Sequence, residues 1–507
     1  MKTITEGRFV LGLCCAMFAT QAYSQNLADF VNDPANGATD IQVQTGNAVQ
    51  RACAMLAGQG GFTLPGEAGD LFLRCNEMVQ TAVALQTDPT GNRPPRDLGL
   101  DGPGLLSAVQ NVAGEELFSQ GTMSTRVTNA QFSNIAGRLN ALRLGGTSAG
   151  AGGRVAYSDP YGNPDRNSPT YNQVSLSGGG AAGDYEVAGS RLGWFIEGSY
   201  NTGDRDQTDA ENAFDFDSTS VTLGLDYMLN SGVIGVSFGT DSYAAEFAVN
   251  TNVNGGGVDV DSTSGSLFAA FYRNNWYFDG ILTFGSLDSD TDRSAFYTSD
   301  NTCPALTPCP GVDARLLGST SGDFFSGGAT VGYDTNKGNW DITTSLSLAM
   351  RDINIDGYTE VDPAGGGLTL SYADQEIESL KSILGISFSR AYSRSWGVLS
   401  PQFRAEWHHE FRDDPLTIIA KYSVEELLAS QGLAGAAGPG FFSLDTSQCF
   451  SCFQATSDNI DTDFGLIGVG LAAVFSQRLQ LYGVFDFLVG GDHISSNTFS
   501  VGLRGQF

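Results

Sequence analysis

Apolar and polar residues alternate with a period of two over most of the second half of the chain. Within 216–229, for example, Val221, Leu223, Leu225 and Tyr227 are separated by threonine, glycine and aspartate. Successive side chains of a strand point to opposite faces, so this pattern predicts strands with one apolar and one polar face. The pattern predicts twelve such strands, at 191–202, 216–229, 232–247, 258–273, 276–292, 320–335, 338–353, 370–390, 395–412, 461–475, 478–491 and 494–507.

The connections between these strands alternate between short and long, except at the last hairpin. Asn230 and Ser231 form one of the short connections, whereas 293–319 and 413–460 are long. Outer-membrane barrels have short periplasmic turns and longer outside loops, and place aromatic residues at the membrane interfaces. Tryptophans stand near four strand starts, at Trp194, Trp276, Trp340 and Trp396. We therefore predict an all-β fold over 191–507, a 12-stranded antiparallel transmembrane β-barrel, in preference to a soluble β-sandwich.

The composition agrees with a barrel that has lipid on one face and water on the other. Only 16% of the residues are charged, and the chain contains 65 glycines and 32 phenylalanines. No stretch reaches about 18 unbroken apolar residues, so membrane insertion beyond the N-terminus would have to use strands. The formal net charge of −30 argues against nucleic acid or anionic lipid as a partner.

The N-terminus has the pattern of an export signal. Lys2 and Arg8 precede the apolar run 9–19, and Ala22 and Ser24 are small residues at the positions that a signal peptidase reads. The run is well short of the roughly 20 residues that span a bilayer, which disfavours a membrane anchor. We expect a signal peptide over 1–24, cleaved after Ser24.

Residues 25–104 are predicted to form a short exported segment with helices near 48–56 and 71–85. Each of these helices carries one cysteine, so a disulfide would join them. The six cysteines beyond the signal fall into three local pairs, which in an oxidising envelope predict the disulfides Cys53–Cys75, Cys303–Cys309 and Cys449–Cys452. Metal binding is a poor alternative, because the chain has only three histidines and no two cysteine pairs are close in sequence.

Residues 105–144 are predicted to be a helical stretch, followed by a linker rich in glycine, serine and asparagine at 145–190. No acid occurs from Leu117 to Ser158, although that stretch contains Arg126, Arg138 and Arg143. Such a basic segment in an acidic chain favours an acidic environment. By strand parity, seven acids face the barrel lumen: Glu197, Asp226, Asp279, Asp341, Glu406, Glu410 and Asp486. We expect the helix to lie in the bore with these arginines against the lumen acids; solvent-exposed arginines are the alternative.

Residues 25–190 offer no catalytic constellation. They contain no histidine, which excludes a Ser-His-Asp triad there, and Leu71 stands where a Gly-Asp-Ser motif would need its serine. His408 faces the lumen beside Glu406 and Glu410; a polar lumen lining is a better interpretation of this trio than a metal site. We expect no enzyme activity, no catalytic residue, no metal and no cofactor.

A signal peptide, a short passenger, a helix leading into a linker and a twelve-strand barrel together resemble the autotransporters of Gram-negative bacteria. The resemblance covers about 190–507 for the barrel, the stretch 129–143 resembles the family's pore-threading helix, and His409-Glu410-Phe411 is similar to a step in these barrels. The C-terminal segment is similar to the family's insertion signal at Ser500, Gly502 and Phe507, and departs from it at Gly505.

The resemblance implies a monomer in the outer membrane that anchors and translocates or displays the segment 25–104. Outer-membrane lipid, the barrel-assembly machinery and periplasmic chaperones are the implied partners. Some members cleave their own helix at an asparagine, and Asn129, Asn134 and Asn140 lie in the corresponding stretch; a permanently attached passenger is the alternative. The alternative function is a plugged channel or structural barrel without a secreted passenger.

Overall fold

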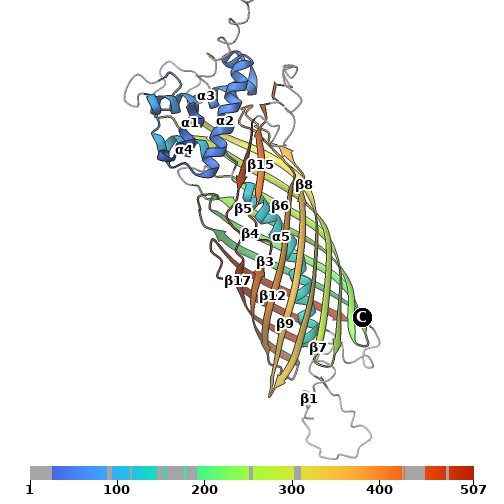
Figure 1. Ribbon diagram of the computed structural model, residues 1–507. Coiled ribbons are helices and arrows are strands. Elements are labelled where there is room, and N and C mark those ends of the chain that lie inside the picture. The colour runs from blue at the N-terminus through green and yellow to red at the C-terminus, as the bar shows by residue number, and fades with distance from the viewer. Residues whose placement is uncertain are drawn as a thin grey trace, which may run out of the picture.

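The structure is a computed structural model, which describes most of the chain (Figure 1). The described residues are 26–87, 94–114, 117–145, 154–155, 176–177, 191–249, 255–301, 310–424, 427–428, 451–475 and 479–506. The predicted cleavage site at Ser24, the pair Cys303/Cys309, Cys449 and the terminal Phe507 lie outside these ranges, as does most of 145–190. Within them, no helix combines the length and the apolar character needed to cross a membrane.

Twelve antiparallel strands close into a barrel, as the alternation predicts. Each strand pairs with its neighbours in the chain order, β12 pairs with β14, and β19 closes the barrel against β3, where Leu503 is opposite Ile196. The strands are β3 (Leu192–Arg205), β4 (Phe214–Leu229), β5 (Gly232–Phe247), β6 (Gly257–Arg273), β7 (Trp276–Tyr297), β8 (Val312–Lys337), β9 (Trp340–Ile355), β12 (Gln375–Ser389), β14 (Gly397–Glu410), β17 (Asp463–Phe475), β18 (Leu479–Val489) and β19 (Ile494–Gln506).

Large apolar side chains cover the outer face of this barrel. Leu223 is 50% exposed, and Leu225 and Phe284 are similarly exposed on their strands. Such a surface would be a liability in water, but it is the face that a membrane barrel presents to lipid. Trp276 and Trp340 are also exposed, next to the short turns at which β7 and β9 begin. The prediction of apolar residues outside is therefore confirmed.

The long connections contain more structure than the sequence pattern predicts. β7 and β8 continue well beyond the predicted ends at 292 and 320, and a separate four-stranded sheet forms mostly where loops were expected. The prediction of one barrel strand over 370–390 is wrong at its start, because 370–372 belongs to this second sheet and the barrel strand begins at Gln375. Its strands are β10 (Tyr358–Thr359), β11 (Leu370–Tyr372), β15 (Thr417–Tyr422) and β16 (Cys452–Thr456), while β13 (Tyr392–Arg394) is a short strand next to β14. The sequence pattern does not predict these as separate strands, because they are too short to show a clear alternation of apolar and polar residues. They also pair with segments that are distant in sequence.

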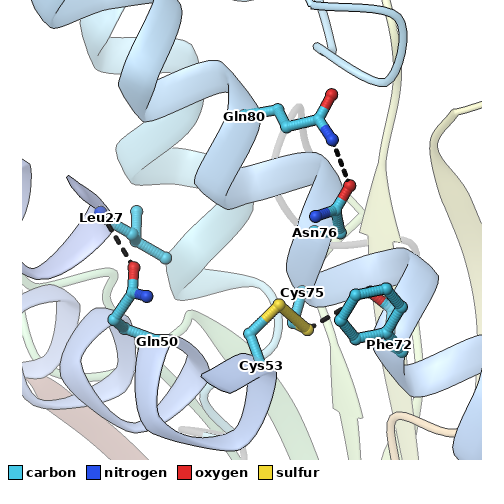
Figure 2. Close-up of a disulfide and its surroundings, with 7 residues drawn as sticks. All are labelled: Leu27, Gln50, Cys53, Phe72, Cys75, Asn76 and Gln80. Atoms are coloured by element: carbon cyan, nitrogen blue, oxygen red, sulfur yellow. Dashed lines mark hydrogen bonds between the residues drawn. A yellow bond between two sulfur atoms is a disulfide. The ribbon is translucent and has the colours of Figure 1, made fainter. Parts of the chain in front are cut away.

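The N-terminal helices form a cap, defined as residues 26–114, at the end of the barrel that carries the long connections (Figure 1). The cap consists of α1 (Asn26–Asn32), η1 (Pro34–Asn36), α2 (Asp40–Gly58), η2 (Gly61–Thr63), α3 (Gly66–Thr87) and α4 (Gly102–Gln110). A capping box starts α2: the side chain of Thr39 accepts from the backbone N–H of Gln42, and the side chain of Gln42 accepts from the backbone N–H of Thr39. The Cys53–Cys75 disulfide joins α2 to α3, as the sequence predicts, and Leu27 N donates to Gln50 Oε1 at 3.1 Å (Figure 2).

A single long helix, α5 (Leu117–Gly145), follows the cap and lies inside the barrel (Figure 1). The prediction of one helix over 105–144 is wrong, because α4 ends at Gln110 and belongs to the cap. The chain turns at Gly114, whose φ of +71° suits glycine and interrupts a helix. Of the linker 145–190, the structure describes one short pairing, between β1 (Arg154–Val155) and β2 (Leu176–Ser177).

Candidate functional site

The barrel lumen and the helix within it form the candidate site. α5 contacts β3, β4, β5, β6, β7, β8, β12 and β17, so the wall surrounds it. Ile135 and Leu139 are fully buried and pack against Phe195, Phe268 and Ile281 of the inner wall. The inner face is thus apolar in places, which period-two parity alone does not predict. This packing removes a turn of the helix from water and fixes the face that it presents to β3, β6 and β7.

Two glycines of the wall provide space for side chains of α5. A methyl group at Gly239 of β5 would overlap the carboxamide of Gln131, and one at Gly328 of β8 would overlap the ring of Phe132. A side chain at either position would therefore force Gln131 or Phe132 out of its present position. We call Gly239 and Gly328 the glycine sockets. They set the depth of α5 against two parts of the barrel wall, β5 and β8, which are separated by β6 and β7.

Polar side chains in the middle of α5 bond to the inner face of β4 and β5. Asn134 Nδ2 donates to Ser220 Oγ at 2.9 Å and to Thr222 Oγ1 at 2.8 Å. Gln131 Oε1 accepts from Thr222 Oγ1 at 2.9 Å, and Gln131 Nε2 donates to Asp241 at 3.3 Å. These groups are buried, so each bond avoids the cost of an unsatisfied polar atom. Sequence analysis did not identify Gln131 or Asp241, because neither is part of a motif.

Arg138 forms the buried ion pair that the sequence predicts for the pore helix. Its guanidinium donates to Asp226 Oδ2, and neither side chain has solvent exposure. The same guanidinium lies 5.2 Å from the centre of the Phe195 ring. Arg504 of β19 approaches the other carboxylate oxygen of Asp226 at 3.4 Å. Asp226 thus holds α5 to the wall at the end of β4 next to the short turn.

Arg126 has different partners from those expected. It donates to Ser496 Oγ at 3.3 Å and lies 4.5 Å from the centre of the Phe216 ring. Among the described residues, the expectation of a carboxylate partner for Arg126 is not met, because the wall at this depth presents a hydroxyl and an aromatic face. From the opposite wall, Arg351 donates to the backbone oxygen of Thr125 at 3.1 Å. The side chain of Arg143 lies outside the described residues, so its partner stays a prediction.

The remaining lumen acids mostly bond within the wall. Glu197 accepts from Tyr482 and lies next to Gly137 of α5. Asp486 forms two bonds with Arg404, at 3.0 and 2.7 Å, and Arg404 also approaches Glu406 at 3.6 Å.

Glu410 and Asp341 also bond to neighbouring residues of the wall. Glu410 accepts from Ser379 Oγ and the backbone of Leu380, Asp279 is half-buried on β7, and Asp341 accepts from Asn336 at a short turn. Of the seven acids, Asp226 is the one that the described structure pairs with an arginine of α5. Four of the seven acids lie within 4.0 Å of a basic side chain, namely Asp226, Glu406, Glu410 and Asp486.

The trio around His408 does not converge on one point. His408 Nε2 lies 3.1 Å from Glu406 Oε2, and its ring stacks on Phe464 at 4.8 Å. Glu410 bonds instead to β12. This arrangement favours a polar lining of the wall over a metal site.

Comparison with known proteins identifies the barrel. Residues 194–441 match the family model described as Autotransporter beta-domain. The barrel is an autotransporter β-domain. An autotransporter β-domain is an outer-membrane barrel of a Gram-negative bacterium that serves passenger translocation, and its outer face contacts lipid.

Curated relatives of this autotransporter match it over part of their length. An uncharacterized protein from the trpE-trpG intergenic region of Pseudomonas putida is 25% identical over 202 residues, which is 38% of this chain and 30% of that protein. Esterase EstA of Pseudomonas aeruginosa is 24% identical over 226 residues, 43% of this chain and 32% of EstA. The chain thus spans about a third of the length of the curated relatives it matches.

Solved translocator domains are similar to this autotransporter in structure. The translocator domain of NalP from Neisseria meningitidis matches with a TM-score of 0.44 and 14% identity, covering 64% of this chain and 90% of that one. The β-domain of the Bordetella autotransporter BrkA matches with a TM-score of 0.40 and 14% identity, covering 63% and 100%.

Proposed function

We propose that this autotransporter displays the cap at the cell surface and that α5 closes its pore in the resting state. The observation that carries the proposal is the order of contacts along the helix. From N- to C-terminus, Gln131, Asn134 and Arg138 contact Ser220, Thr222 and Asp226 in turn, each closer to the short turn that ends β4. The helix therefore connects the long-loop end to the short-turn end through the bore.

Loop lengths assign the two ends of this path. The short turns of outer-membrane barrels face the periplasm and the longer loops face outwards. The cap packs against the long connections, so this orientation puts residues 25–104 outside the cell and the linker 145–190 on the periplasmic side. The buried contacts of α5 with the wall support a closed pore. They also support a passenger that stays joined to its barrel.

The remaining expectations of the sequence extend this proposal. We propose export by the signal peptide 1–24, escort by periplasmic chaperones and insertion as a monomer by the barrel-assembly machinery. The machinery would read Ser500 and Gly502 on β19 together with Phe507. The pairs Cys303–Cys309 and Cys449–Cys452 stay predicted disulfides of the outside loops.

We propose a role in display without catalysis. EstA is named an esterase, and the match spans 32% of that protein. Residues 25–190 of this chain contain no histidine for a Ser-His-Asp triad. A plugged channel or structural barrel without a displayed passenger is the alternative function.

Surface labelling of single cysteine variants separates the two functions. Thr63 is exposed in the cap, and Lys337 is exposed at the short turn between β8 and β9. We expect a membrane-impermeant maleimide to label Thr63→Cys on intact cells, and to label Lys337→Cys only after the outer membrane is permeabilised. The wild-type chain provides the background labelling. Labelling of Lys337→Cys but not Thr63→Cys on intact cells would contradict display of the cap.

A further inference from the structure

The cap shares one hydrophobic core with the barrel's long connections. Its buried members on the cap side include Leu56, Leu71 and Met78, and on the barrel side Leu368 and Tyr422. Residues from both sides line the same small cavity, where Leu368 and Tyr422 meet Leu71 and Met78. The barrel-side members of the core come from the tips of β7 and β8, the four-stranded sheet and the segments next to it: Ala295, Tyr297, Leu316, Leu368, Leu370, Tyr372, Ile418, Ala420, Tyr422, Val424, Leu427, Leu428, Phe453 and Ala455.

The segment around Gly367 lies directly against α3. A methyl group at Gly367 would overlap the backbone of α3 at Glu67 and Leu71. The backbone N–H of Gly367 donates to Asp70 Oδ2 at 3.1 Å. Such close approach of two backbones leaves no room for a water layer between the two parts.

Further hydrogen bonds join α2 and the turn after α4 to the barrel side. Arg51 donates to the backbone oxygen of Cys452 at 2.7 Å, and Tyr422 Oη donates to the backbone oxygen of Val112 at 3.0 Å. Asn111 Nδ2 donates to the backbone oxygen of Phe296 at 2.6 Å. The last bond satisfies a carbonyl at the tip of β7, where β7 still pairs with β8 but no longer with β6.

Glu77 of α3 is a fully buried charge at this junction. It accepts from Tyr297 Oη at 3.0 Å and from the backbone N–H of Gly311 at 3.2 Å, both on the barrel side. From the cap, Arg96 donates to it and Arg74 lies 3.5 Å away. Burial raises the pKa of the Glu77 carboxyl, and the nearby arginines oppose that rise.

We propose that the tips of β7 and β8 and the four-stranded sheet are a docking surface for the chain's own N-terminal helices, which stay bound to it without a covalent link. This inference rests on the proposed function, and it adds that the cap is a fixed lid on the barrel rather than a releasable passenger. The apolar core, the backbone contacts at Gly367 and the bonds to Glu77 carry it. The Cys53–Cys75 disulfide lies wholly within 26–87 and so does not tie that segment to the barrel.

Cutting the chain between α3 and α4 tests the proposal. A site-specific protease sequence is inserted after Thr87, which is exposed at the end of α3. Intact cells are treated with the protease and sedimented, and the fragment that ends at the cut is measured in the pellet and in the medium. We expect the fragment to stay with the cells. A fragment found mainly in the medium overturns the docking proposal.

A matched pair of variants tests the docking surface itself. Leu368→Glu places a charge in the shared core, whereas Val361→Glu places the same charge at a position in the same connection that is 63% exposed. We expect Leu368→Glu to raise the released fraction at least about tenfold, because burying an unpaired charge is costly, and Val361→Glu to behave as wild type. Equal retention of all three chains overturns the assigned surface.

Two further measurements keep the result unambiguous. Gly367→Val, which would collide with the α3 backbone without adding a charge, should also raise release, and heat-modifiable migration confirms that each variant barrel has folded. If the protease cuts only after the outer membrane is permeabilised, the cap is not outside the cell and the proposed function fails. If it cuts on intact cells and the fragment leaves, display stands and docking fails.

Discussion

Replacing Arg138 with glutamate should open the pore. The guanidinium of Arg138 on α5 and the carboxylate of Asp226 on β4 are both fully buried between the helix and the wall. The substitution removes the cation and places a carboxylate next to Asp226 and near Glu197. Arg504, at 3.4 Å from Asp226, remains as a weak compensation.

The size of the effect follows from the burial of the pair. Breaking a buried ion pair by removing one partner costs about 3–5 kcal/mol. Like-charge repulsion adds to this cost, so we take about 3 kcal/mol as a lower bound. Since about 1.4 kcal/mol corresponds to a tenfold change, the ratio of displaced to seated helix should rise at least about 100-fold.

Planar lipid bilayer recordings of the purified full-length chain measure this ratio as the frequency of open events. Ser133→Glu is the matched control, because it puts the same charge at an exposed position of α5. We expect frequent openings with Arg138→Glu and few with Ser133→Glu. Deletion of 117–144 should raise conductance further. If Arg138→Glu opens no more often than wild type, the ion pair does not hold the helix and the reasoning fails.

Three other outcomes are expected. Gly239→Leu should force Gln131 out of its socket and raise open events more than about tenfold, while Gly280→Ala, where a methyl group meets nothing within 4 Å, should leave the recordings unchanged. Cys53→Ser should destabilise the cap by roughly 3 kcal/mol, seen as faster proteolysis of the cap on intact cells without a change in barrel heat-modifiability. Burial raises the pKa of Glu77 from its ordinary value of 4.5, so its protonated form favours the docked cap. This contribution to the stability of the docked cap is complete below the ordinary pKa of Glu77. It is lost as the pH rises through the raised pKa of the docked state. Retention of the nicked cap should therefore weaken as the pH rises above 4.5, and Glu77→Gln should remove this dependence; a flat wild-type profile would contradict it.

Local patterns determined the barrel strands, their number and their outward apolar faces. A strand alternates its side chains by covalent geometry, so Val221, Leu223 and Leu225 reveal a lipid-facing face without any knowledge of the neighbouring strands. The Cys53–Cys75 pairing was also accessible, because both cysteines lie on adjacent predicted helices. The arginine-rich, acid-free stretch pointed to the helix that carries Arg138, since a charge imbalance is a property of composition.

Only the tertiary structure decided which groups meet. The break at Gly114 and the pairing of β11 with β15 depend on contacts between segments that are distant in sequence. A local pattern of residues does not show which distant segments the chain brings together. The same holds for the space that Gly239 leaves for Gln131 and for the hydroxyl and ring that face Arg126. The partner of a side chain inside a barrel is set by strand register and by the depth of the helix. These are global quantities, because moving the helix by one turn would exchange every partner at once.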